Sequence, residues 1–112
     1  MTMTVEITTT RVGTTALVAP HGDIDLVTSP DFRTAVHAAI DDGADAMVID
    51  LSGSGFLDST ALGVLVSVHR RLGDRLAVAC PQPAVRRLFD ITRFSTVLRL
   101  HASVDEALAA VR

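Results

Sequence analysis

The residues best placed for chemistry form the triplet Asp58-Ser59-Thr60, which precedes an apolar stretch with helical spacing. A short apolar run at 47–51 predicts a buried strand, and the glycines that follow it interrupt regular structure before the helix. The Asp58 carboxylate can accept hydrogen bonds from the free backbone N–H groups of the first helical turn. The Ser59 hydroxyl then lies at a helix N-terminus, where aligned backbone dipoles favour an added anion. A serine there can carry a phosphate without unfolding its domain, although all three residues can also serve only to start the helix.

The sequence does not predict an enzyme. A nucleophilic serine needs a positioned base, and a carboxylate next to it in sequence does not provide one. The histidines are scattered without a metal-binding spacing, and no glycine-rich phosphate loop is present. Asp23 and Asp25 could bind a divalent ion, but two acids in one short loop are more often a solvated rim. We therefore expect no catalytic residues, metal or cofactor, and a protein that is acted upon.

Size and composition predict one domain over residues 1–112. No apolar run approaches the roughly 18 residues that cross a bilayer, and the N-terminus lacks the features of a signal peptide, so we expect a cytoplasmic protein that does not bind membranes. The net charge of −3, without a single lysine, argues against direct nucleic-acid binding. Cys80 is the only cysteine, and we expect a packed thiol. His37 and His69 fall in predicted helices, where partly exposed surface positions are expected.

Hydrophobic periodicity predicts an α/β fold with the element order β-β-α-β-α-β-α-β-α. This order gives a single mixed, mostly parallel sheet of about five strands with about four helices, beginning with a hairpin. Loops that follow parallel strands gather at one edge, so the loops at 22–28 and 53–60 should be neighbours. The predicted strands lie at 5–7, 16–19, 47–51, 76–80 and 97–100, and the predicted helices at 28–41, 59–72, 81–91 and 103–111.

Three helix features carry specific expectations. Thr28 or Ser29 should cap the first helix, and the Ser103–Glu106 spacing is typical of a capping box at the last helix. In the helix after Ser59, Val64 and Val68 lie four residues apart, on a second face beside the main apolar stripe. That second face indicates either burial against a neighbouring helix or contact with a partner protein.

Three segments together resemble the STAS domain family (sulphate transporter and anti-sigma-factor antagonist), and within it the small bacterial anti-sigma-factor antagonists. The segment Asp50-Leu-Ser-Gly-Ser-Gly-Phe-Leu-Asp-Ser-Thr-Ala-Leu-Gly resembles the family signature. The segments at 22–33 and 83–92 are similar to the first conserved loop and to a late helix with its exit. The resemblance covers roughly positions 4 to 111. It independently implies the STAS fold.

The resemblance implies a switch in transcription regulation, of the kind used in stress response or sporulation signalling. The unphosphorylated form would bind an anti-sigma factor that is also a serine kinase, and so release a sigma factor. The kinase would phosphorylate Ser59, with Thr60 as second choice, and a phosphatase would reset the cycle. An alternative is a non-switching STAS scaffold or accessory subunit of a larger signalling or transport assembly. We expect a monomer or weak dimer. The candidate partner-binding residues are Asp23, Asp25, Asp58, Ser59, Thr60, Val64 and Val68.

Overall fold

The structure, a computed structural model, describes residues 5–111. The chain forms one sheet flanked by helices, with short 3-10 turns at Gly73–Arg75 and Phe94–Thr96. The strands are β1 (Glu6–Val12), β2 (Thr15–His21), β3 (Ala46–Asp50), β4 (Leu76–Ala79) and β5 (Leu100–His101). The helices are α1 (Ser29–Asp41), α2 (Ser59–Leu72), α3 (Pro83–Ile91) and α4 (Val104–Val111).

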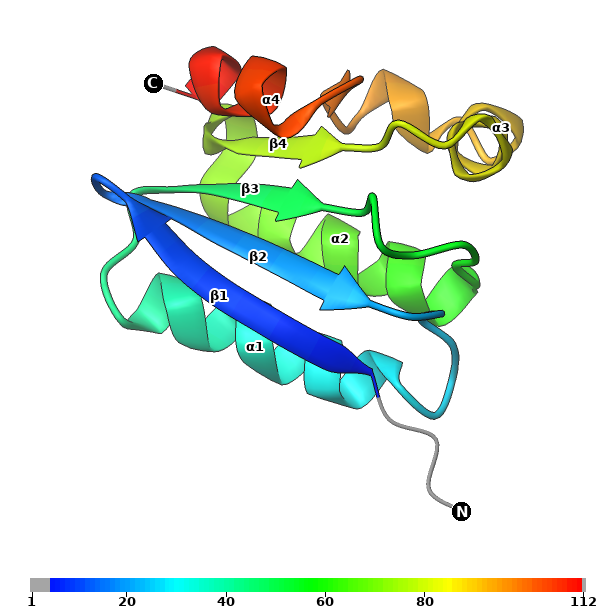
Figure 1. Ribbon diagram of the computed structural model, residues 1–112, viewed down its shortest axis with the longest axis horizontal. Helices are drawn as coiled ribbons and strands as arrows, with labels where there is room; N and C mark the ends of the chain where they lie inside the picture. The colour runs from blue at the N-terminus through cyan, green and yellow to red at the C-terminus, as the bar shows by residue number, and fades with distance from the viewer. Residues whose placement is uncertain (1–4, 112) are drawn as a thin grey trace.

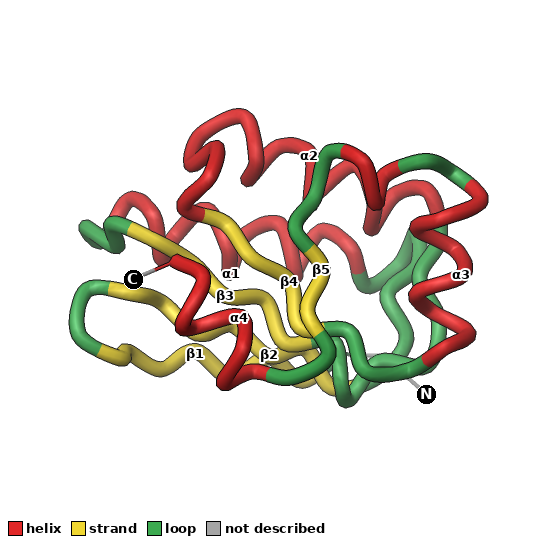
Figure 2. The backbone as a smooth tube through the Cα atoms, turned by 90° about the horizontal axis from the view of Figure 1, so that it is seen from above, coloured by secondary structure: helices red, strands yellow, loops and turns green. Residues whose placement is uncertain are grey.

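The sheet has five strands in the order β1-β2-β3-β4-β5. The β1–β2 hairpin is antiparallel, and every later neighbour pair is parallel. Helices α1 and α2 cover one face of the sheet, and α4 lies on the other (Figure 1). The carboxyl ends of β2, β3 and β4 point to one edge, where α3 stands beside the loops (Figures 1 and 2). The predicted mixed α/β fold is confirmed.

The central strand β3 is buried on both faces, as its apolar sequence predicts. Met47 and Ile49 belong to the main core under α1 and α2, whereas Val48 faces the smaller core under α4. This alternation follows from the two-residue period of a strand. The strand therefore anchors its C-terminal loop firmly, because the residues just before the loop are enclosed.

Val64 and Val68 lie in the core, with exposed fractions of 1% and 0%. Their inclusion among the partner-binding residues is therefore wrong, and burial against a neighbouring helix is the correct interpretation. Helix α2 packs against the sheet and also against α1. A helix with two packing neighbours needs an apolar arc wider than one stripe.

Two predicted boundaries also need correction. The first strand was predicted at 5–7, but β1 spans Glu6–Val12. The last strand was predicted at 97–100, but β5 spans Leu100–His101. Arg93 adopts a left-handed conformation with φ 63°, and the chain winds into a 3-10 turn before the strand. The Leu98 side chain is buried after this turn, and its N–H donates to the Phe94 carbonyl at 2.8 Å. From the sequence, a buried apolar residue such as Leu98 looks the same in a turn as in a strand. Hydrophobic periodicity therefore placed the strand too early.

Candidate functional site

The candidate site is formed by the β2–α1 loop and the β3–α2 loop, which lie against each other at the carboxyl edge of the sheet. The Gly22 N–H donates to the Gly53 carbonyl at 3.0 Å, and the Ile24 N–H donates to the Phe56 carbonyl at 3.0 Å. The Asp58 N–H in turn donates to the Ile24 carbonyl at 3.1 Å. The predicted proximity of the two loops is thus confirmed, and backbone hydrogen bonds hold them in register.

Gly53 is required by the closeness of this contact. A Cβ at this position would lie 2.9 Å from His21 Nδ1 and 3.2 Å from the Pro20 carbonyl oxygen. Ser54 is fully buried, and its hydroxyl donates to the same Pro20 carbonyl at 3.3 Å. The Gly-Ser pair therefore joins the β3–α2 loop to the end of β2.

The β2–α1 loop is closed by its own polar side chains. The Asp25 carboxylate accepts from the N–H groups of Val27 at 2.9 Å and Thr28 at 3.1 Å. The Thr28 hydroxyl donates to the Asp23 carbonyl at 2.9 Å and makes no side-chain cap on α1. Thr28 occupies the N-cap position but closes the loop instead, so the prediction that its side chain caps the helix is wrong. Asp25 supports the loop, and the Asp23 side chain is exposed.

Asp58 caps α2 as predicted. Its carboxylate accepts from the N–H groups of Thr60 at 2.9 Å and Ala61 at 3.2 Å, and also from the Thr60 hydroxyl. The Thr60 hydroxyl is the main cause of the lowered pKa of Asp58. Burial acts in the opposite direction, and the backbone N–H groups of Ala61, Thr60 and Leu26 lower the pKa further. The β2–α1 loop lies against the cap, because the Asp58 N–H donates to the Ile24 carbonyl.

Ser59 is the first residue of α2, and its side chain is exposed. Thr60 is half-buried, with its hydroxyl engaged by Asp58. Within residues 5–111, the structure shows no hydrogen bond from the Ser59 hydroxyl. The arrangement therefore presents one free hydroxyl at a helix N-terminus, beside the exposed Asp23 loop.

The two paired loops beside α2 also carry three exposed apolar side chains, which sequence analysis missed. Leu26 is 73% exposed, Val27 67% and Phe56 53%. The two loops that carry these side chains contain acids but no lysine or arginine. Exposed apolar side chains gathered at one edge are typical of a protein–protein contact surface. The sequence does contain a signal for these exposed side chains. Leu26, Val27 and Phe56 lie among turn-forming residues, where an apolar side chain is not expected to be buried in a strand or a helix.

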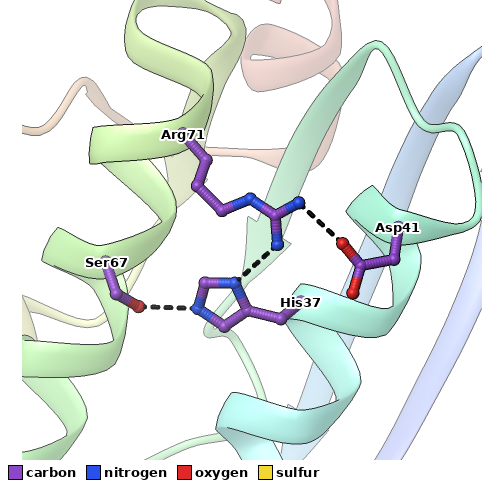
Figure 3. Close-up of polar contacts among 4 residues, drawn as sticks. All are labelled: His37, Asp41, Ser67 and Arg71. Atoms are coloured by element: carbon purple, nitrogen blue, oxygen red, sulfur yellow. Dashed lines mark hydrogen bonds and ion pairs between the residues drawn. The ribbon is translucent and has the colours of Figure 1, made fainter.

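A second polar cluster lies between α1 and α2, away from the loops (Figure 3). Arg71 donates to His37 Nδ1 at 3.0 Å and to Asp41 at 2.6 Å. Because arginine only donates, Nδ1 must accept, and His37 Nε2 then donates to the Ser67 hydroxyl at 2.8 Å. Burial, followed by the charges of Arg71 and Arg33, lowers the pKa of His37, while Asp41 acts in the opposite direction. The cluster thus holds a neutral imidazole.

We expect this cluster to make stability depend on pH. A histidine whose pKa is lowered by folding binds protons more readily in the unfolded chain, so its contribution is complete above about pH 6.5 and lost as the pH falls through the folded value. His37→Gln should therefore lose less unfolding free energy on acidification than the wild type, measured by urea unfolding at several pH values. His69→Gln is the matched control. Equal pH dependence in wild type and His37→Gln would contradict the prediction.

Cys80 and the possible metal ligands are two further kinds of reactive group within residues 5–111. Cys80 is buried as predicted, and burial raises the pKa of its thiol. Within the described residues, no three histidine, cysteine or acidic side chains are grouped so that they could hold a metal ion. None of the helices in that part of the chain has the length and apolar character needed to span a membrane.

The sequence profile of the STAS domain matches residues 6–107. The chain belongs to the STAS domain family. It is similar to the anti-sigma-F factor antagonist RsfB of Mycobacterium tuberculosis, with 29% identity over 99 residues, which cover 87% of this chain and 81% of RsfB.

Solved structures show the same fold. The crystal structure of an anti-sigma factor antagonist from Mycobacterium paratuberculosis superposes with a TM-score of 0.90 at 33% identity, covering 96% of this chain and 94% of that one. The phosphorylated form of the Bacillus cell fate determinant SpoIIAA superposes with a TM-score of 0.70 at 21% identity, covering 96% of this chain and all (100%) of SpoIIAA. The second comparison supports the fold alone.

Proposed function

We propose that this protein is an anti-sigma-factor antagonist whose binding to its partner is ended by phosphorylation of Ser59. The observation that carries the proposal is the exposed Ser59 hydroxyl at the first residue of α2, within the edge formed by the two paired loops. The names of the two mycobacterial relatives support the antagonist function. SpoIIAA, which shares the fold, is described in both phosphorylated and unphosphorylated forms.

In the proposed cycle the unphosphorylated chain binds an anti-sigma factor, which then releases its sigma factor. The anti-sigma factor is also the kinase: Ser59 Oγ attacks the γ-phosphorus of ATP, the bond to ADP breaks, and the hydroxyl proton is released. A phosphatase restores the hydroxyl with water and yields inorganic phosphate. The chain contributes the acceptor and the docking surface, acts in the cytoplasm as a monomer or weak dimer, and binds no nucleic acid directly.

The unmodified surface favours binding for two reasons. The exposed side chains of Leu26, Val27 and Phe56 gain free energy when a partner removes them from water. Asp23 is exposed beside them and can pair with a cation of the partner. Phosphate on Ser59 adds about −1.5 to −2 charges and a strongly hydrated group to this surface. The partner would have to dehydrate that group next to existing acids.

The local hydrogen bonds favour Ser59 over Thr60 as the acceptor. The Thr60 hydroxyl already donates to Asp58, whose carboxylate also caps the helix. A kinase acting on Thr60 would have to break that contact and move a half-buried side chain, whereas Ser59 is already exposed. Asp58 thus acts as a positioning residue that leaves Ser59 available.

The proposal predicts which residue the kinase labels. With the cognate anti-sigma factor and ATP, the wild type should gain one phosphate by intact-mass measurement, and Ser59→Ala should gain none. Thr60→Val is the matched control and should be labelled like the wild type. Equal labelling of wild type and Ser59→Ala would contradict the assignment, and loss of label in Thr60→Val alone would move the site by one residue.

In the alternative of a non-switching scaffold, Ser59 would only start the helix, and the face with Val64 and Val68 would be a permanent interface. Both side chains are enclosed in the core and cannot form one without unfolding. Protein purified from its native host distinguishes the alternatives, because a switching protein should contain a fraction that is heavier by one phosphate.

A further inference from the structure

An apolar groove lies between the β3–α2 loop and α3, and the antagonist cycle described above does not assign it a role. Its volume is about 220 Å³. For scale, an engineered apolar cavity of about 150 Å³ in another protein accommodates benzene. The groove therefore has room for one branched aliphatic or aromatic side chain. It is lined by Gly55, Phe56, Leu57, Ala84, Val85 and Leu88.

The groove is continuous with the docking surface around Ser59. Phe56 lines the groove, is 53% exposed, and is hydrogen-bonded through its carbonyl to the β2–α1 loop. That loop carries the exposed Leu26 and Val27. A protein that covers Ser59 and these side chains therefore also reaches the mouth of the groove.

The charge beside the groove is acidic on the side of the loops. Gly55 lines the groove, and a Cβ built on it would lie 3.7 Å from Asp23 Oδ1, so the Asp23 carboxylate borders the opening. Neither loop contains a lysine or arginine that could neutralise this carboxylate from within the loops. A complementary partner brings a cation to this side of the groove.

We propose that the groove receives one apolar side chain of the anti-sigma factor, next to a basic residue of the same partner that faces Asp23. This inference rests on the proposed antagonist function. It assigns the affinity for the partner and the control of binding to two different places on the surface. The enclosed apolar contact supplies affinity, as central buried anchors do in protein interfaces. Ser59, at the edge of the same surface, supplies the control. A partner lacking the anchor would bind weakly whether or not Ser59 is phosphorylated.

Filling the groove tests the proposal. Ala84 is exposed on α3, so Ala84→Phe can occupy the groove without entering the core. Ala109→Phe places the same side chain at an exposed position of α4 and is the matched control. In calorimetric titrations of the purified cognate anti-sigma factor, we expect Ala84→Phe to weaken binding by about tenfold or more and Ala109→Phe to match the wild type. Phe56→Ala should also weaken binding, because it removes one wall.

The charge component has its own readout. Asp23→Asn should lower the affinity and also reduce its dependence on salt, since one charge pair is lost. If the affinity of this variant depends on salt as strongly as that of the wild type, the proposal that a basic residue of the partner faces Asp23 is wrong.

The outcomes separate this inference from the function on which it rests. Failure of the wild type to bind the anti-sigma factor would overturn the antagonist function itself. If the wild type binds normally and a folded Ala84→Phe variant binds with undiminished affinity, the proposed role of the groove is wrong, but the antagonist function is not affected. Loss of self-association in Ala84→Phe, with partner affinity unchanged, would assign the groove to a second copy of the chain and likewise overturn the proposal.

Discussion

Phosphorylation of Ser59 should weaken binding to the anti-sigma factor by hundreds-fold, which corresponds to about 3–4 kcal/mol. The added group must be dehydrated at the interface, and it lies next to Asp58 and near Asp23. Like charges at a site from which water is excluded repel more strongly than in solution. The uncharged hydroxyl of the unmodified serine imposes neither cost.

Ser59→Asp should bind with an affinity between those of the wild-type and phosphorylated proteins, because a carboxylate has one charge and two oxygens where phosphate has nearly two charges and three oxygens. Its fold should survive, since an acid in the first turn of α2 interacts favourably with the helix dipole by roughly 0.3–1 kcal/mol. Titration calorimetry of all three forms against one partner measures the series. If Ser59→Asp has a normal circular dichroism spectrum and undiminished affinity, the claim that negative charge at this position weakens partner binding is wrong.

Val68→Ala should destabilise the domain by about 2–3 kcal/mol without changing partner affinity. Val68 has no exposed surface. Removing two buried carbon groups costs about 0.8 kcal/mol each in transfer free energy, and the cavity left behind adds to this loss. Urea unfolding measures the first effect and calorimetry of the folded variant measures the second.

Val66→Ala, on the same helix but half-buried, is the control and should cost less. The opposite pattern, normal stability of Val68→Ala with weakened partner binding, would return Val68 to the interface and contradict its place in the core.

The sequence by itself determined the features that depend on near neighbours in the chain. The Asp58 cap acts over two and three residues. At the last helix the Ser103 hydroxyl accepts from the Glu106 N–H three residues on, while the Glu106 carboxylate accepts from the Ala102 N–H, one residue before the predicted partner. Helix ends of this kind are decided by local hydrogen bonds, so residue type and spacing are sufficient. The meeting of the two loops was also predictable, because parallel strands connected by helices place their carboxyl ends at the same edge.

Only the tertiary structure decided which surfaces are covered. The residue types and spacing of Val64 and Val68 fit a buried face of the helix as well as a face that contacts a partner. The packing of α1 beside α2 placed both side chains in the core. The groove joins Phe56 to Leu88, which belong to segments far apart in the chain. Thr28 had a capping residue's type and position, yet its hydroxyl bonds the loop behind it. For the valines and the groove, the deciding neighbour comes from elsewhere in the chain, and burial depends on that neighbour. For Thr28 the partners Asp23 and Asp25 are only five and three residues away, but the conformation of the loop decides that the hydroxyl contacts them instead of capping α1.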